Sequence, residues 1–145
     1  MSDVAALATT LISEILNVEQ RLTAQISRVL PSGMEMSHFA VLNYLVRAQG
    51  EKTPAQLAAA LHVTRGAMTN TLSKLEIAGH IHIRPDWDDA RRKWVALSPA
   101  GKSAYDAAIG GILPFVEALT ADLGEAKIRA ALPILRELRL NLDES

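Results

Sequence analysis

The chain has 145 residues, of which 49% are hydrophobic and 21% are charged, and its formal net charge is −1. This composition is typical of a globular protein with one well-buried core, and the absence of cysteine excludes disulfides and thiolate metal sites. No segment approaches the run of about 18 apolar residues that spans a membrane. Because Met1-Ser2-Asp3 also lacks the features of a signal peptide, we expect a cytoplasmic protein without a membrane partner.

Two amphipathic helices are predicted in the first third of the chain. Apolar residues recur at spacings of three and four from Leu11 to Val29, which predicts one long helix over residues 3–30. A second apolar pattern predicts a helix over residues 36–48. A brief strand is expected at residues 51–52.

The next two patterns predict a pair of short helices joined by a tight turn. Thr53 has the position of an N-cap, Pro54 stands at the first helical position, and Gln56 can complete a capping box. Thr64 is the N-cap candidate of the second helix. The core-facing stripe of that helix follows at spacings of four, three and four: Met68, Leu72, Leu75 and Gly79.

The opposite face of this second helix is short, polar and free of acids. A solvated face usually carries Glu and Lys pairs, whereas Thr, Asn, Ser and Gly allow close approach to base edges in the DNA major groove. An ordinary exposed face is the alternative, and the helix alone leaves both readings open. The residues of this polar face are Arg65, Gly66, Thr69, Asn70, Ser73 and Lys74.

Two short alternating runs then predict a β-hairpin. Ile81 and Ile83 alternate with polar residues, and Val95 and Leu97 do the same. The loop over residues 85–92 mixes acids with arginines, and a carboxylate beside a guanidinium can hold it in a fixed orientation. An oriented arginine at a loop tip suits the narrow minor groove of DNA.

The rest of the chain predicts two more helices. The first begins at Ser98 and continues past Gly110 and Pro114, which should loosen or kink it. The second follows a break near Gly124 and should be kinked at Pro133. Together with the first helix of the chain, these helices offer more apolar surface than a small domain buries, so we expect them to need a partner. Packing on their own chain alone is the alternative.

The stretch from Thr53 to Gly101 resembles the DNA-binding domain of the MarR family of bacterial transcriptional regulators. The specific part is the wing segment Asp89-Ala90-Arg91, followed by Val95-Ala96-Leu97-Ser98-Pro99-Ala100-Gly101. The similarity extends upstream through Phe39-Ala40-Val41-Leu42.

Two residues depart from the family pattern. Asn70 stands where many members carry Arg, which shifts the expected base preference from guanine toward adenine. His38 stands where other members often carry Gln before Phe, and in the family this position is expected to lie near the ligand pocket. The missing cysteine excludes the cysteine-peroxide switch that some members use.

The resemblance implies a mainly α fold with a small β-hairpin wing, a winged helix-turn-helix flanked by N- and C-terminal dimerisation helices. We expect one structural unit over residues 1–145, with dimerisation helices at 1–32 and 102–145 and the DNA-binding region at 33–101. In the family the first and last helices of two subunits interleave. That arrangement would place two recognition helices about one DNA turn apart.

The predicted function is that of a sequence-specific transcriptional regulator, a ligand-responsive repressor that binds a pseudo-palindromic operator in double-stranded DNA as a homodimer. The net charge of −1 argues mildly against DNA binding. However, residues 51–97 carry seven basic and five acidic residues, so the middle of the chain is its basic third. Asp89, helped by Asp88, is expected to orient Arg91 for the minor groove. The expected DNA-binding residues are Thr64, Arg65, Thr69, Asn70, Ser73, Lys74, Arg84, Asp89, Arg91, Arg92 and Lys93.

The resembled family often binds small anionic or aromatic molecules between the dimer helices and the winged domain. The polar candidates for such an effector site on the first two helices are Asn17, Arg21, His38 and Tyr44. A solvated surface explains Asn17 and Arg21 equally well.

Other functional classes find less support. The alternative function is a helical ligand-binding or protein-interaction adaptor that keeps the fold without binding DNA, which the acidic total favours. His80 and His82 suggest a metal site, but two ligands are not a site, and we expect neither a metal nor a cofactor. No phosphate loop or nucleophile motif is present, so we expect no enzyme.

Overall fold

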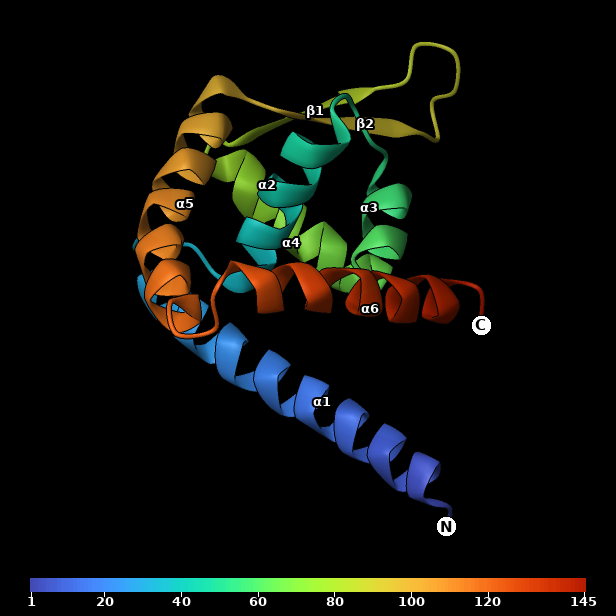
Figure 1. Cartoon of the computed structure of the whole chain (residues 1–145). Helices are drawn as coiled ribbons and strands as arrows, with labels where there is room; N and C mark the ends of the chain where they lie inside the picture. Colours follow the sequence, from blue (N-terminus) through green and yellow to red (C-terminus); the bar gives the residue numbers. More distant parts are fainter. The chain divides into compact units, whose positions relative to one another are not determined.

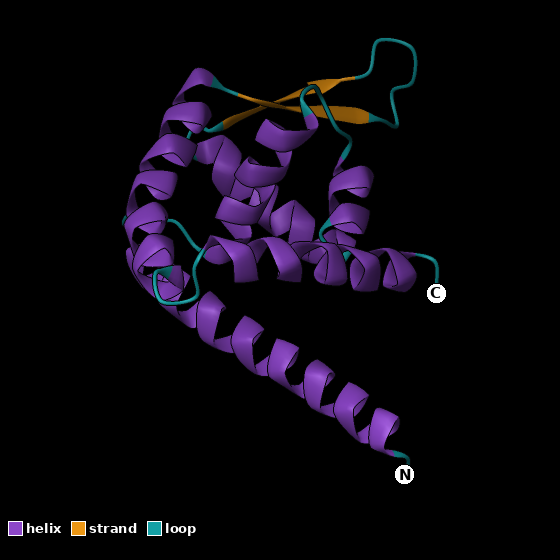
Figure 2. Ribbon diagram, viewed as in Figure 1, coloured by secondary structure: helices purple, strands orange, loops and turns teal.

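The computed structural model describes all 145 residues and consists of six helices and one two-stranded antiparallel hairpin. Figures 1 and 2 show the order and type of these elements. The fold class predicted from the sequence is confirmed. The elements are α1 (Asp3–Val29), α2 (Met36–Ala48), α3 (Pro54–Ala60), α4 (Arg65–Ile77), β1 (Ile81–Pro85), β2 (Lys93–Leu97), α5 (Pro99–Thr120) and α6 (Glu125–Asp143).

Contacts within the chain divide it into two compact units, Met1–Ile112 and Leu113–Ser145. The boundary falls inside α5, between Ile112 and Leu113 and just before Pro114. The first unit contains the winged domain, and the second consists of the end of α5 and of α6. The division of the chain into dimerisation helices and a DNA-binding region is a functional one and stays a prediction.

The helix-turn-helix begins at the predicted caps. The Thr53 hydroxyl accepts from the Gln56 backbone N–H at 3.1 Å, and the Thr53 N–H donates to the Gln56 side chain at 2.9 Å, which completes the capping box. The Thr64 hydroxyl accepts from Ala67 N at 3.1 Å and caps α4. Between the two helices His62 takes a positive φ of 53°, so the chain turns there.

A single apolar cluster joins α2, α3, α4 and the hairpin. Three residues of the predicted stripe of α4 face it, because Met68, Leu72 and Leu75 are all buried, whereas Gly79 lies beyond the end of the helix and is exposed. This cluster fixes the orientation of α4 against the hairpin, and it leaves the opposite face of the helix in solvent. The buried members are Val41, Leu42, Leu45, Leu57, Ala58, Met68, Leu72, Leu75, Ile81 and Val95.

The hairpin pairs in a register that puts its apolar residues on the core side. Ile83 lies opposite Val95, and Arg84 lies opposite Trp94 on the solvent side. Lys52 adds a single bridge to Val95 on the free edge of β2, with N···O distances of 3.0 and 2.7 Å. The brief strand expected at residues 51–52 is therefore one residue pair, which ties the start of α3 to the wing.

The start of α5 is attached closely to the turn between α4 and β1. The Ser98 hydroxyl donates to the Gly79 carbonyl oxygen at 2.6 Å and accepts from the Gly101 N–H at 2.9 Å. A side chain at Gly101 would collide with the His80 carbonyl oxygen, so glycine permits this approach. Gly79 itself has φ 78° and ends α4 as predicted.

The outer helices carry exposed apolar side chains. No residue of α1 or α6 is buried. The exposed fraction is 70% for Leu7 and 64% for Leu16 in α1, and 73% for Leu142 in α6. Both predicted prolines lie inside helices that continue through them, and Gly124 begins α6 with φ 81°. No single helix is long and apolar enough to cross a membrane, and only α5 and α6 taken together pass that test of length and composition.

Candidate nucleic-acid interface

A groove of about 650 Å³ lies between α3, the first turns of α4 and the wing. Four cations and one carboxylate line it, together with the N-terminal residues of α3. The structure thus brings six of the predicted DNA-binding residues to one place: Arg65, Thr69, Asp89, Arg91, Arg92 and Lys93. The groove also contains a part that the sequence analysis treated only as a helix cap: Thr53, Pro54, Ala55 and Gln56.

The polar face of α4 is open to solvent. Thr64, Asn70, Ser73 and Lys74 are exposed and complete the predicted set on this helix. The Thr69 hydroxyl donates to the Arg65 carbonyl at 2.9 Å, which leaves the oxygen lone pairs as acceptors. A Cβ added at Gly66 would meet nothing within 4 Å. The helix therefore presents an uncovered surface that another molecule can approach closely.

The wing loop is held by two aspartates. One oxygen of Asp86 accepts from Asp88 N at 2.8 Å and from Asp89 N at 3.3 Å, and the other accepts from Trp94 Nε1 at 2.9 Å. These bonds hold the pKa of Asp86 below its ordinary value because they stabilise the carboxylate, and the bond from Asp88 N has the largest effect. The loop closes with Asp86 N donating to the Arg92 carbonyl at 3.0 Å.

Asp89 orients Arg91 as the sequence pattern suggests. Its Oδ1 accepts from Arg91 N at 3.0 Å and from Arg91 Nε at 3.3 Å. The side chain of Arg91 is nevertheless 92% exposed, so much of the donor capacity of its guanidinium is open to solvent. Asp88 makes no such ion pair, and the second wing carboxylate with a structural role is Asp86 instead.

Arg84 lies outside the groove. Its Nε and Nη2 donate to the two carboxylate oxygens of Glu51 at 2.9 and 3.0 Å, which forms a bidentate ion pair. The hydrogen bond with Glu51 raises the pKa of Arg84 above its ordinary value. The guanidinium carbon also lies 5.9 Å from the ring centroid of Trp87. Sequence reasoning missed Glu51, because it stands 33 residues from Arg84 and no local pattern joins the two.

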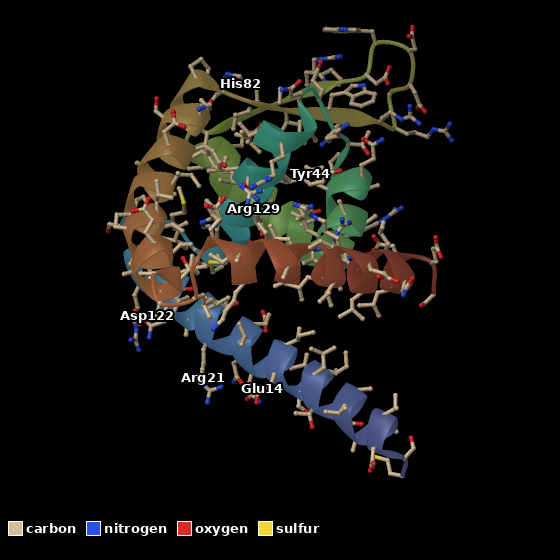
Figure 3. The ribbon with its side chains drawn as sticks, in the orientation of Figure 1. Glu14, Arg21, Tyr44, His82, Asp122 and Arg129 are labelled. Atoms are coloured by element: carbon tan, nitrogen blue, oxygen red, sulfur yellow. The ribbon has the colours of Figure 1, made fainter.

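The four candidate effector residues occupy separate environments in the protomer. His38 is buried, and its Nδ1 accepts from Glu35 N at 3.0 Å as part of the α2 capping box. Tyr44 is half-buried against the core. Arg21 donates to Asn17 at 3.2 Å on the exposed side of α1, where Figure 3 shows Arg21 pointing away from the winged domain. A hollow of about 220 Å³ beside Asn17 and Arg21 is formed by α1 alone.

No group of three or more histidine, aspartate or glutamate side chains is placed to hold a metal ion. His82 is exposed and His80 is half-buried at the start of the hairpin. The structure therefore does not extend the His80 and His82 pair into a metal site.

A helix-turn-helix followed by a two-stranded wing, with cations from both on one groove, defines the molecule as a winged helix-turn-helix protein. Residues 32–92 match the family model described as MarR family. This segment, which holds α2, α3, α4, β1 and the wing loop, is therefore similar to the MarR family, and the rest of the chain lies outside the match. No curated protein sequence matches the chain significantly.

Solved structures of transcriptional regulators share the fold over nearly the whole chain. The regulator BldR from Sulfolobus solfataricus is 19% identical, with a TM-score of 0.85 over 97% of this chain and 99% of that one. A mutant of MarR from E. coli, complexed with operator DNA, is 24% identical, with a TM-score of 0.78 over 94% and 99%. BpsR from Bordetella bronchiseptica, whose DNA binding is regulated by 6-hydroxynicotinic acid, is 19% identical, with a TM-score of 0.75 over 88% and 98%.

Proposed function

We propose that this protein is a homodimeric, ligand-responsive repressor that binds a pseudo-palindromic operator in double-stranded DNA. The observation that carries the proposal is the groove in which Arg65 at the start of α4 and the wing cations Arg91, Arg92 and Lys93 converge. Basic side chains gathered on one face supply phosphate contacts even where the whole chain is slightly acidic. A repressor of this kind acts in the cytoplasm, where the DNA is.

Each element of the groove has a distinct role in this proposal. The exposed polar face of α4 enters the major groove, where Asn70 reads base edges and Thr64, Arg65, Thr69, Ser73 and Lys74 contact bases or phosphates. Arg91, oriented by Asp89, enters the minor groove, while Arg92 and Lys93 contact phosphates. We leave Arg84 out of the DNA contacts, because Glu51 occupies its guanidinium.

Dimerisation and effector binding are the finer parts of the proposal. The exposed apolar side chains of α1 and α6 support a dimer, since burying them removes apolar surface from water. The operator complex of E. coli MarR and the control of BpsR by 6-hydroxynicotinic acid support DNA and a small aromatic acid as partners. For the effector we retain Asn17, Arg21 and Tyr44, because His38 serves as a helix cap.

The test is fluorescence anisotropy with duplex DNA from upstream of the gene, against a scrambled duplex of equal length. The titration is repeated over about 50 to 200 mM salt, where phosphate contacts make affinity fall steeply. Selective, salt-sensitive binding is the expected result. A folded dimer that binds neither duplex at micromolar concentration would contradict the proposal and favour the adaptor function.

A further inference from the structure

Trp87 is the most exposed aromatic side chain of the wing, with 81% of its surface open to solvent. An indole ring offers a large rigid apolar area, which water solvates poorly and which a partner usually covers. The groove accounts for Trp94 but not for Trp87, which is absent from its lining. The position of Trp87 therefore calls for a separate explanation.

Trp87 is held on a fixed support. It follows Asp86 directly, and Asp86 is anchored by three hydrogen bonds to the loop and to Trp94. On the other side, Arg84 lies 5.9 Å from the ring centroid and is itself bound through two hydrogen bonds to Glu51. A ring presented in this way loses little conformational freedom when it binds, so the contact it makes retains more of its free energy.

The loop that carries Trp87 also carries Arg91. The two residues lie on opposite arms of one short loop, which the bond from Asp86 N to the Arg92 carbonyl closes at its base. Arg91 lines the groove, and Trp87 lies outside it. If the tip of this loop enters a minor groove with Arg91, the arm with Trp87 must face a wall of that same groove, and the wall consists of deoxyribose rings and phosphates.

We propose that Trp87 is a further DNA contact, whose indole packs on the deoxyribose wall of the minor groove that Arg91 enters. This inference rests on the function proposed above. The indole of Trp87 combines an exposed apolar body with an N–H donor, and a sugar-phosphate wall offers both apolar carbons and acceptor oxygens. The loop that presents Trp87 also carries Arg91 and Arg92, and Lys93 follows them at the start of β2, so the cations next to it along the chain favour this polyanionic partner over a neutral protein surface.

The first experiment observes Trp87 directly. The chain has two tryptophans, so Trp87→Phe leaves Trp94 as the only emitter, and the emission of the wild type minus that of Trp87→Phe reports on Trp87 with the loop intact. Trp94→Phe leaves Trp87 alone but removes the hydrogen bond from Trp94 Nε1 to Asp86, so it serves only as a cross-check. With the upstream duplex, the Trp87 emission should be quenched, and its accessibility to acrylamide should fall by about half or more as the exposed ring becomes covered. Circular dichroism verifies that both variants are folded.

The second experiment measures affinity. Trp87→Ala should weaken operator binding about fivefold to tenfold, as truncation of a buried tryptophan at an interface does, whereas Trp87→Phe should recover most of the affinity. The slope of affinity against salt should stay unchanged, because no phosphate contact of a cation is lost. The matched control is Ile77→Ala, since Ile77 is 84% exposed at the end of α4 and outside the groove.

The outcomes separate the two proposals. Operator binding by the wild type together with unchanged Trp87 emission, or with full affinity of Trp87→Ala, would overturn the role of Trp87 and leave the repressor function standing. A change in Trp87 emission with protein concentration alone, without DNA, would overturn it in favour of a contact between copies of the chain. Absence of operator binding by the wild type would overturn both proposals.

Discussion

At the scale of single residues, the wing depends on carboxylates that organise cations and backbone groups. Asp89 holds Arg91 through two bonds to the same oxygen, yet leaves 92% of the arginine side chain exposed. An exposed arginine with a restricted direction loses less entropy on entering a narrow groove than a free one does. Exposed ion pairs contribute little to the stability of a fold, so the proposed DNA contact gives this pair a role that stability does not.

Arg91→Ala is expected to cost about 1 to 3 kcal/mol of operator binding, because it removes the proposed minor-groove contact. Anisotropy titration measures the loss, and thermal unfolding should stay nearly unchanged. Lys74→Ala is the comparison, since it should weaken binding to all sequences equally and reduce the salt slope by about one. Undiminished affinity of Arg91→Ala would show that the wing assignment is wrong.

Asp86 predicts an acid-sensitive wing. Its pKa is lowered in the folded protein, so the stabilisation that its carboxylate provides is complete above the ordinary value of 3.8 and is lost as pH falls through the folded-state pKa. In a Trp87→Phe background the emission of Trp94 should therefore change below pH 3.8, when its acceptor becomes protonated.

Asp86→Asn should abolish that acid transition, because an amide does not titrate. The amide also cannot accept all three hydrogen bonds, so the loop should be less firmly held at every pH. Asp88→Asn is the control, since the Asp88 carboxyl accepts none of the bonds that anchor the loop. A transition that persists in Asp86→Asn would assign it to another group.

At the scale of elements, the close contact between α5 and the turn before β1 allows only glycine at position 101. Gly101→Ala would place a methyl group against the His80 carbonyl oxygen and disturb the Ser98 bridge. Overpacking of this kind costs about 1 to 3 kcal/mol of unfolding free energy. Urea denaturation measures it, and Gly110→Ala is the matched control in the same helix, where a Cβ meets nothing within 4 Å and should be neutral or stabilising.

Elements with local signals were predictable from the sequence. The caps at Thr53 and Thr64 act over three residues, and both helices begin at these caps. The Asp89-Ala90-Arg91 wing is equally local. The pairing of Arg84 with Glu51 was not predictable, because it depends on the bridge that brings the start of α3 beside the hairpin.

The effector candidates were chosen from their places on the first two helices and, for His38, from the family pattern, and neither shows what a side chain already binds. Periodicity puts His38 on the inner side of α2, and it cannot show that its Nδ1 accepts from Glu35 N. For Asn17 and Arg21 the protomer offers only a shallow hollow on one helix. If two subunits form the effector pocket together, its lining residues share no local spacing in the sequence, so the sequence pattern does not predict them.

At the scale of the whole molecule, the exposed apolar faces of α1 and α6 predict that the protomer is not the functional form. The combined variant Leu7→Glu and Leu16→Glu should dissociate the dimer, because it puts two carboxylates into an apolar interface. Sedimentation velocity measures the change, and affinity for a full operator should fall while a half-site is bound as before. Ile77→Glu makes the same change on an exposed residue outside these helices, and should remain dimeric.

The Ser98 bridge has a mechanical consequence. One hydroxyl connects the carbonyl at the end of α4 to the first turn of α5, while Gly101 lets the same turn abut the His80 carbonyl. The C-terminal end of α4 and the first turn of α5 are therefore held together in a close, hydrogen-bonded contact. A tilt of the first turn of α5 would therefore move α4 as well, and in the function proposed above an effector would reorient α4 by this route without contacting it.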